Sequence, residues 1–389
     1  MSPIDHILFF SSLFVLFHVW GKISYNIKDN TRYWAYALVP IMAFALITGM
    51  RYGWGVDYLW YKYQFDNAFT TFDWQVIEQN KGFLLLNKAL NTLGFNYVAA
   101  FIFYSFVFVP CAFVLIRSYG AYSKYMYALL IPACIYSVTW SIRQGFSFNF
   151  VFLALYFLHN KKWLGVAASV FLAATIHGGN IIIMATIALC YLFANKKPFD
   201  WKATIPIYLF FVFFPDVTKT RINIIVDYIV GIVGKVSLGD SKFQSYIDRS
   251  DMWLSEDAAH LEWQQGFYAL MLDTLFYCSI IYLGYRALKQ KNNPTITYLY
   301  NTMVLGIIFF RAVFYFEILR RIAGPLMSLY FLVLGYSIAA VSQELKKTIH
   351  KKTVNAGLYY LPLGFILLYL FLYWGRWIFF NDMPGFIWS

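Results

Sequence analysis

The sequence predicts an all-α, polytopic membrane protein. Hydrophobic residues make up 60% of the chain and charged residues only 13%, a composition that separates it from soluble globular proteins. A helix needs about 20 mostly apolar residues to cross the hydrocarbon core of a bilayer, and the chain offers about twelve such stretches. They begin near Ile7, Tyr33, Tyr97, Tyr125, Gly145, Trp163, Gly179, Ala203, Gly266, Ile296, Ile322 and Gly357.

Charged residues set the expected orientation of these spans in a single integral membrane domain, residues 1–389. With the N-terminus outside, every inner connector carries Lys or Arg, which is typical of cytoplasmic loops. An even number of spans with both termini outside fits this pattern. The net charge of +12 follows largely from these topological lysines, so no nucleic acid partner is indicated. The inner acids are Asp29, Asp200 and Glu344.

The first span is expected to be retained, because Met1–His6 has no basic region and no small-residue cleavage site follows the span.

The second span leads to a polar, aromatic cluster. After the second span, arginine offers donors for phosphate or carboxylate, a carboxylate can act as a base, and aromatic rings can stack on sugars. A carbohydrate or lipid-phosphate site is therefore predicted at this helix mouth. The cluster contains Arg51, Trp54, Asp57, Tyr58 and Tyr61.

Two outer stretches depart from the pattern of spans. Within the first outer loop, residues 51–96, the segment Gly82–Leu93 is apolar but too short to cross a bilayer, and we expect a half-embedded or interfacial helix. The second stretch, residues 216–265, is long enough to be a lid or binding loop. Its acids lack a firm metal-ligand spacing, so no metal and no cofactor are predicted. These acids are Asp248, Asp251, Glu256 and Asp257.

Two middle spans each have a polar residue at the outer end. Arg143 and Gln144 follow the span from Tyr125, and this arginine either reaches lipid headgroups, as arginines at helix ends do, or binds an anionic ligand. His177 ends the span from Trp163 and is either a satisfied interfacial residue or a catalyst. The glycines that follow His177 let a ligand or another chain approach its ring.

Late in the chain, three arginines lie within eleven residues around one outer turn: Arg311, Arg320 and Arg321. They either form an internal network with Glu317 or Asp273, or bind an anion. In total, eight of the eleven arginines fall outside, against the insertion rule, which favours an outer surface that meets a phosphate-bearing ligand. The outer arginines are Arg51, Arg143, Arg221, Arg249, Arg311, Arg320, Arg321 and Arg376.

Taken in order, these motifs resemble the EpsG family of exopolysaccharide polymerases, relatives of the O-antigen polymerase Wzy. The resemblance covers most of the chain. Two features depart from the family pattern: the residues before Gly82 lack a proline often found there, and Asn381–Gly385 only partly matches the closing Pro-aromatic motif. The resemblance rests on Arg51–Tyr58 with Tyr61, Glu78–Phe83, Arg143–Gln144, His177 and Arg320.

The resemblance implies a polymerase that joins undecaprenyl-diphosphate-linked oligosaccharide repeats on the outer face of the bacterial cytoplasmic membrane. It also implies a fold related to the GT-C membrane glycosyltransferases. The expected partners are the lipid-linked oligosaccharides and membrane lipids, and the resemblance allows for a chain-length regulator protein. Since no pair of carboxylates is arranged for a double displacement, direct displacement with inversion is expected.

The chemistry of the residues agrees with this activity. Departure of a diphosphate needs preorganised donors, each worth about 3 to 4 kcal/mol in a transition state, and the attacking hydroxyl needs a base, which is Asp57 or His177. Arg51 is expected to orient Asp57 or to bind the second lipid carrier. Diphosphate binding is expected from Arg143, Gln144, Arg311, Arg320 and Arg321. Sugar binding is expected from Trp54, Tyr58, Tyr61 and Glu317.

Two other functions fit part of the pattern. Twelve spans and inward-facing cations would also suit a transporter or flippase of lipid-linked oligosaccharide, although the chain has no detectable internal repeat and its polar residues gather at one face. An O-antigen ligase or an acyltransferase would share an outer site of histidine and arginine. Release of lipid diphosphate distinguishes glycosyl transfer from transport.

Overall fold

The computed structural model describes residues 3–53, 58–67, 81–215, 266–314, 317–349 and 357–380. This part of the chain is built from helices, which confirms the predicted all-α class. The elements are α1 (Pro3–Ser24), α2 (Asn30–Gly49), α3 (Tyr58–Asp66), α4 (Lys81–Thr92), α5 (Tyr97–Arg117), the short 3-10 helix η1 (Gly120–Tyr125), α6 (Met126–Trp140), α7 (Ile142–His159), α8 (Trp163–Ile176), α9 (Asn180–Phe193), α10 (Trp201–Phe213), α14 (Phe267–Gln290), α15 (Pro294–Ala312), α16 (Glu317–Ser328), α17 (Tyr330–Ile349) and α18 (Gly357–Phe380).

Each predicted span corresponds to a helix that starts close to the expected residue. Within the described ranges, four helical stretches are long and apolar enough to cross a membrane: Asn30–Gly49, Tyr97–Arg117, Phe267–Gln290 and Leu319–Ser342. The last of these covers most of α16 and α17. Several other helices, among them α8, α9 and α10, are apolar but shorter. The number of twelve spans and the GT-C architecture stay predictions.

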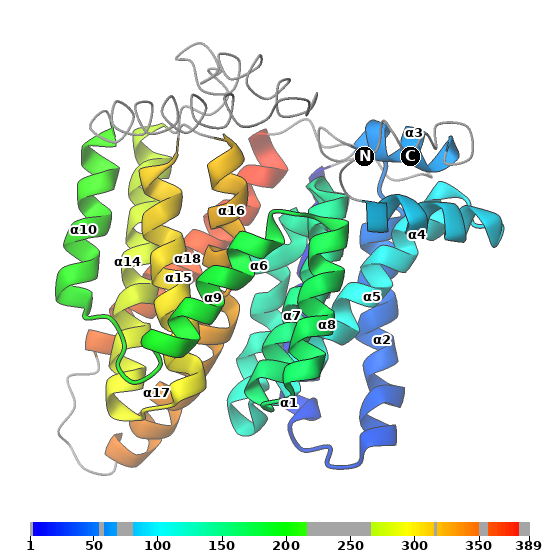
Figure 1. Cartoon of the computed structure of the whole chain (residues 1–389). Helices are drawn as coiled ribbons and strands as arrows, with labels where there is room; N and C mark the ends of the chain where they lie inside the picture. The colour runs from blue at the N-terminus through cyan, green and yellow to red at the C-terminus, as the bar shows by residue number, and fades with distance from the viewer. Residues whose placement is uncertain are drawn as a thin grey trace.

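The helices run between two sides of the assembly, called here the upper and lower sides as they lie in Figure 1. The lower side holds the connectors α1–α2, α7–α8, α9–α10 and α14–α15, and the upper side holds α3, α4 and the α8–α9 turn. The lower connectors contain the expected lysines, for example Lys28, Lys161 and Lys196. The basic connectors predicted for the inner side therefore share one side of the described fold.

Helix caps explain two of the three acids that the charge pattern assigned to the inner side. The Asp29 carboxylate accepts a hydrogen bond from the Arg32 backbone N–H at 2.7 Å and starts α2. Asp200 does the same for α10, accepting from the Lys202 N–H at 3.0 Å. Such caps satisfy backbone donors that have no partner within the helix. These acids therefore begin helices at the basic side.

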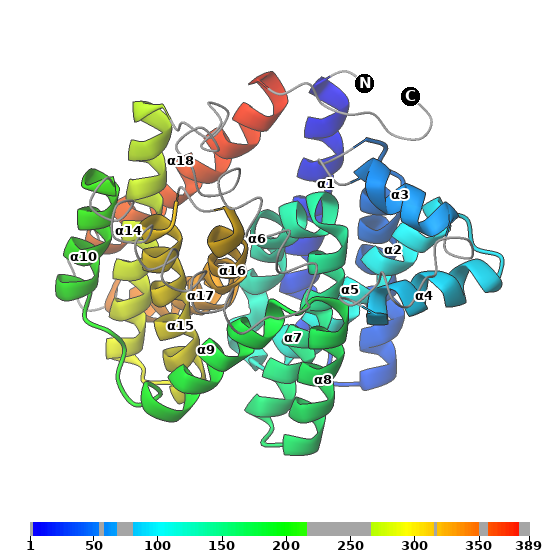
Figure 2. The same ribbon diagram turned by 45° about the horizontal axis from the view of Figure 1, so that its top comes forward.

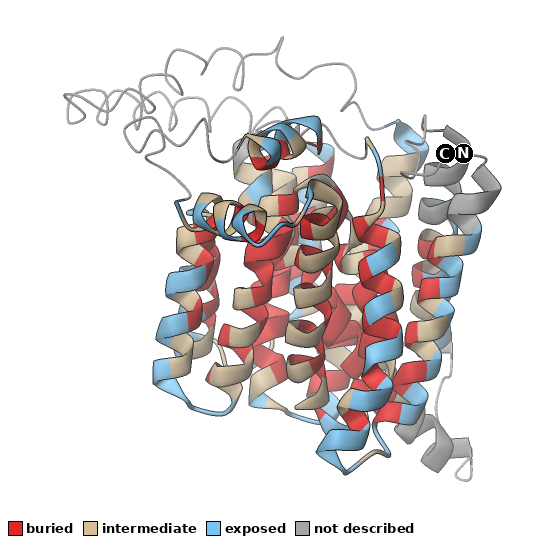
Figure 3. Ribbon diagram, turned by 90° about the vertical axis from the view of Figure 1, so that its right-hand side faces the viewer, coloured by how far each residue is buried: buried red, intermediate tan, exposed pale blue. Residues whose placement is uncertain are grey.

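Buried residues lie toward the interior of the bundle, whereas many residues on the outer faces of the helices are exposed (Figure 3). A large apolar core joins helices from α1 to α18. A second, smaller cluster lies at the upper side, where α3 and α4 lie side by side near α2 and α5 (Figures 1 and 2). We call it the α3–α4 cluster. It consists of Tyr58, Tyr61, Phe65, Phe83, Leu90, Ala100, Phe101, Tyr104, Ile142, Phe146 and Ile176.

The short helix predicted at Gly82–Leu93 is α4, Lys81–Thr92. It buries Phe83, Asn87 and Leu90, a spacing that places all three on one face of a helix. The Asn87 amide oxygen accepts a hydrogen bond from the buried Tyr104 hydroxyl of α5, which gives this polar side chain a partner. Whether α4 is half-embedded in a bilayer stays a prediction. The predicted lid, residues 216–265, lies outside the described residues.

Candidate functional site

Motifs that are far apart in the sequence meet in the α3–α4 cluster. Tyr58 and Tyr61 come from the first motif and Phe83 from the second, and all three belong to one buried cluster with Ile142 and Ile176. Those two isoleucines directly precede Arg143 and His177 in the chain. A buried apolar contact therefore fixes the backbone at both positions. The cluster brings the start of α7 and the end of α8 to one place on the upper side.

The first turn of α7 carries Arg143 and Gln144 and is held on two sides. The α6 helix ends at Trp140, and Ser141 breaks it before α7 begins. The Gln144 side chain donates from Nε2 to the carbonyl oxygen of Arg321 at 2.7 Å, which joins α7 to α16. Gly145 lies directly against the Ser137 carbonyl of α6. This close backbone packing fixes the position of the first turn of α7, from which the side chains of Arg143 and Gln144 project.

Substituting Gly145 with alanine should therefore displace α7 from α6. An added Cβ would overlap the Ser137 carbonyl oxygen and lie 2.8 Å from the Val138 Cα, and backbone atoms cannot move aside like a side chain. We expect a loss of about 1 to 3 kcal/mol of stability from this overpacking, measured by thermal unfolding in detergent. The matched control is Gly364→Ala in α18, where a Cβ meets nothing within 4 Å. Equal unfolding temperatures for both variants would contradict the expected clash.

His177 caps α8 in extended backbone geometry, with its N–H bonded to the Ala173 carbonyl at 2.9 Å. Burial of the ring and the positive charges of Arg143 and Arg321 lower the pKa of His177 to about 4. The imidazole is therefore neutral near pH 7 and can accept a proton. The structure thus places His177, Arg143 and Arg321 within electrostatic reach of one another, as the sequence analysis required for a shared site.

Arg311 and Arg320 meet at one aromatic ring, that of Phe314. The Arg311 guanidinium carbon lies 4.5 Å from the ring centroid and that of Arg320 lies 5.4 Å from it, both within the range of cation–π attraction. The ring thus holds two positive groups near each other at the junction of α15 and α16. Sequence reasoning missed Phe314, and its only signal was an aromatic residue between spaced arginines. Glu317 starts α16, but its side chain lies outside the described part.

Open space borders two of the elements that carry these residues. A Cβ added to Gly178, next to His177, would meet nothing within 4 Å, and the same is true of Gly324. Gly324 follows Arg320 by four residues, so both lie on the same face of α16. Gly179 is different, because its Cβ would lie 3.1 Å from His177 Nε2. The glycines therefore keep the surroundings of His177 and Arg320 uncrowded.

Arg51 differs from these arginines in its contacts, because it is buried and bonds to backbone carbonyls. Its side chain is only 1% exposed and donates to the backbone carbonyls of Thr48, Val138 and Thr139. The Tyr58 hydroxyl donates to the carbonyl oxygen of Arg51 at 3.0 Å. The expected orientation of Asp57 by Arg51 stays a prediction, since residues 54–57 lie outside the described part. The same holds for Trp54.

The aromatic residues of α3 divide into buried and exposed sets. Tyr58 and Tyr61, the predicted sugar-binding residues, are buried in the α3–α4 cluster. Trp60 and Tyr63, which the sequence analysis did not single out, are 56% and 51% exposed. Their rings stack with centroids 5.8 Å apart and an interplanar angle of 21°. In the structure, the exposed aromatic faces of α3 are thus those of Trp60 and Tyr63.

Within the described ranges, no three His, Cys, Asp or Glu side chains come together as a metal site would require. Among the described residues, the guanidinium groups of Arg143 and Arg321 act electrostatically on a neutral imidazole, that of His177. Arginine binds phosphate oxygens through two parallel hydrogen bonds. The upper side can therefore hold an anion and take up a proton next to it.

The comparison with protein families agrees with the motifs. A family model described as the EpsG family matches residues 34–387, which confirms the resemblance derived from the motifs and is consistent with a relationship to Wzy. The searches of curated proteins and of solved structures found no similar protein. With its apolar helices, this membership implies a membrane protein with a role in making polysaccharide. The chain belongs to the EpsG family.

Proposed function

We propose that this protein is a polysaccharide polymerase that transfers an undecaprenyl-diphosphate-linked glycan to the sugar of another lipid-linked repeat unit. The observation that carries the proposal is the convergence of Arg143, Arg321 and His177 in a member of the EpsG family. The reaction takes place on the outer face of the cytoplasmic membrane, which corresponds to the upper side. The basic lower connectors support this orientation, because cytoplasmic loops collect lysine and arginine.

In the proposed reaction, an acceptor hydroxyl oxygen attacks the anomeric carbon of the donor sugar. The bond from that carbon to the diphosphate oxygen breaks, and the lipid diphosphate leaves with the electron pair. Arg143 and Arg321 bind the departing charge, with Arg311 and Arg320 beside Phe314 adding positive potential. Attack from the opposite side inverts the anomeric centre.

The hydroxyl proton passes to His177, which is neutral at physiological pH because its pKa is about 4. Asp57 is the other candidate base from the sequence. Sugar binding by Trp54 and Glu317 belongs to the same proposal, since residues of these types stack on rings or accept hydrogen bonds from hydroxyls. The positive groups at the site repel a proton from His177 until an anion offsets them.

Exposed apolar side chains on the two helices that flank His177 are compatible with a lipid-linked ligand. Phe171 of α8 is 67% exposed, and Ile181 and Ile182 of α9 are also exposed. These residues lie within six positions of His177 along the chain. A ligand with a charged head and a long hydrocarbon chain could place its head at the arginines and its tail along this surface, where hydrocarbon contact is favourable.

The protein in liposomes should lengthen lipid-linked repeats in excess chelator and release undecaprenyl diphosphate. The arginines can neutralise a diphosphate without a cation, so chelator should not reduce the rate. Products are measured by chromatography of the glycan and of the lipid. Movement of intact substrate across the bilayer without bond cleavage would indicate a flippase. Activity that is lost with chelator and restored by magnesium would instead assign a metal role to Asp248, Asp251, Glu256 and Asp257.

A further inference from the structure

The carbonyl groups at the ends of α2 and α6 converge on one buried side chain. A helix leaves its last four carbonyls without partners in the helix. Thr48 belongs to the last turn of α2, and Val138 and Thr139 belong to the last turn of α6. Their carbonyl oxygens all accept hydrogen bonds from Arg51, at 3.2 Å for Val138 and 3.1 Å for Thr139. Arg51 therefore caps two helices at once.

The positive charge of Arg51 is favourable at the ends of α2 and α6. A positive group at a helix C-terminus interacts favourably with the helix dipole, and here two such ends face the same guanidinium. The Phe101 ring adds a contact at 5.5 Å from the guanidinium carbon. A buried cation without such partners would be costly. With only 1% of its side chain exposed, the guanidinium is committed to the protein interior.

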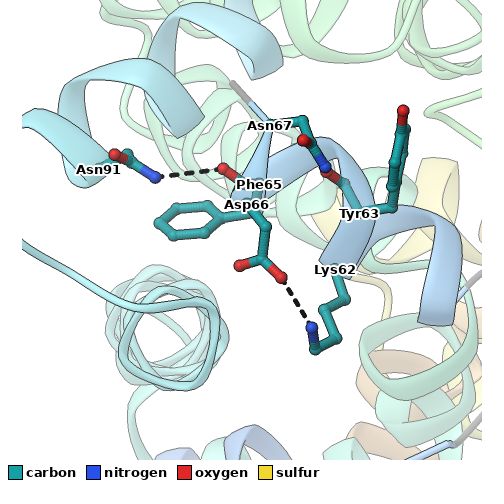
Figure 4. A network of polar contacts seen from close by, with 6 residues as sticks. All are labelled: Lys62, Tyr63, Phe65, Asp66, Asn67 and Asn91. Atoms are coloured by element: carbon teal, nitrogen blue, oxygen red, sulfur yellow. Dashed lines mark hydrogen bonds and ion pairs between the residues drawn. The ribbon is translucent and has the colours of Figure 1, made fainter. Parts of the chain in front are cut away.

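The backbone of Arg51 is held as firmly as its side chain. The buried Tyr58 hydroxyl, on α3, donates to the Arg51 carbonyl. The α3 helix is itself tied to α4, because the Asn91 side chain of α4 donates to the Phe65 carbonyl at 3.2 Å (Figure 4). Within α3, Lys62 pairs with Asp66 at 2.7 Å. Lys62 also lies 4.7 Å from the Tyr97 ring centroid of α5. The backbone of Arg51 is thus bonded to a helix, α3, that itself contacts α4 and α5.

The end of α6 is separated from the start of α7 by Ser141 alone. Whatever fixes the Val138 and Thr139 carbonyls therefore also fixes the position from which Arg143 and Gln144 project. We propose that Arg51 is a positioning residue, which holds the first turn of α7 in place through these carbonyls and does not itself touch the ligand. This inference rests on the proposed function for the identity of the ligand.

Lysine cannot take the place of Arg51 in this role. The guanidinium sends N–H groups in several fixed directions within one plane, whereas a lysine has one nitrogen at the end of a flexible stem. The three carbonyls belong to two different helices, and one nitrogen cannot reach all of them with good geometry. Arg51→Lys should therefore keep the charge and lose the connection between α2 and α6.

The first experiment measures amide hydrogen exchange in the full-length protein in detergent. Arg51→Lys should increase exchange in residues 141–146, which include the Gly145 N–H bonded to the Ser141 carbonyl at 2.7 Å. Tyr58→Phe, a milder change, should act in the same direction. The matched control is Arg117→Lys on the lower side, where the arginine bonds to Asn30 and stacks on Tyr33. Unchanged exchange in Arg51→Lys would overturn the proposal.

The second experiment measures binding of farnesyl diphosphate to the folded fraction of each variant. Arg143→Ala should weaken binding roughly 10- to 100-fold, as expected for loss of charged hydrogen bonds. Arg51→Lys should weaken it too, and the double variant should bind no more weakly than Arg143→Ala alone, because both changes act through one contact. Additive losses would mean that Arg51 contacts the ligand directly, and unchanged binding would mean a purely structural role. Either result overturns the proposal.

The two experiments separate failure of this inference from failure of the proposed function. If Arg143→Ala binds farnesyl diphosphate as well as the unaltered protein does, the anion site of the proposed function is wrong. Hydrogen exchange at residues 141–146 would still decide whether Arg51 positions α7. If Arg143→Ala loses binding while Arg51→Lys changes neither exchange nor affinity, the proposed function stands and the positioning role falls.

Discussion

Arg143→Lys should abolish polymer formation while the protein remains folded in the membrane. Arg143 projects from the turn that Gln144 and Ile142 fix, so the charge of a lysine would stay nearby. Lysine nevertheless lacks the paired N–H groups that match two phosphate oxygens. Loss of one preorganised donor costs typically 10² to 10³ in rate, or about 3 to 4 kcal/mol. Chain length on gels and turnover by the purified protein give the readout.

The matched control for this change is Arg117→Lys, which alters an arginine of the lower side. It should leave polymer length and turnover unchanged. Normal polymer from Arg143→Lys would show that charge alone suffices, and contact of Arg143 with lipid headgroups would then be the better account. Loss of polymer together with loss of folded protein would be a stability effect, so unfolding temperature is measured for both variants.

His177→Ala should lower turnover by about 10² to 10⁴, the range of general base catalysis. The base works in its neutral form, so activity is complete above its pKa and falls as the pH drops through it. In the free protein that pKa is about 4. The profile of kcat/KM, which reports the free enzyme, should therefore stay flat through neutral pH and fall near pH 4.

The profile of kcat should fall at a higher pH than that of kcat/KM. Positive charge from Arg143 and Arg321 contributes to the low pKa of His177, and a bound diphosphate offsets that charge, so protonation becomes easier in the complex. Asp57→Asn should keep measurable turnover. An inactive Asp57→Asn variant beside an active His177→Ala variant would transfer the role of base to Asp57.

The positions of the helices follow closely from the sequence. Apolar stretches bounded by lysines and capping residues such as Asp29 and Asn293 mark where helices begin, and these signals are local. Whether short helices such as α8 and α9 cross the bilayer is a different matter, since length and composition alone select only four spanning stretches among the described residues.

The candidate site was partly predictable for a physical reason. Arginines on the outer side of a membrane protein are costly to insert, so Arg143, Arg320 and Arg321 are conspicuous in the sequence itself. The proximity of Arg143 and Arg321 to His177 could not be read from the sequence, because it depends on how residues such as Ile142 and Ile176 pack in one cluster. The residue types indicated the chemistry, and tertiary packing decided which of them share a site.

Tyr58 and Tyr61 show what a motif leaves undecided, and their role in sugar binding stays a prediction. An aromatic residue beside a polar turn can stack on a ligand or fill a core, and residue type does not distinguish the two. Both are buried, and the Tyr58 hydroxyl bonds to the Arg51 carbonyl. The helical spacing of α3 is the signal that separates the two sets. Tyr58, Tyr61 and Phe65 share one buried face, whereas Trp60 and Tyr63 lie on the opposite, exposed face.

The contacts of Arg51 also impose an order on biosynthesis. Thr139 follows Arg51 by 88 residues, and ribosomes add about 5 to 20 residues per second, so roughly 4 to 18 seconds pass between them. During that interval the guanidinium has no α6 carbonyl to bond, and its free energy is lower in water than in an apolar environment. The α2 helix is therefore synthesised early, but the full set of Arg51 hydrogen bonds at its end can form only after α6 has been made.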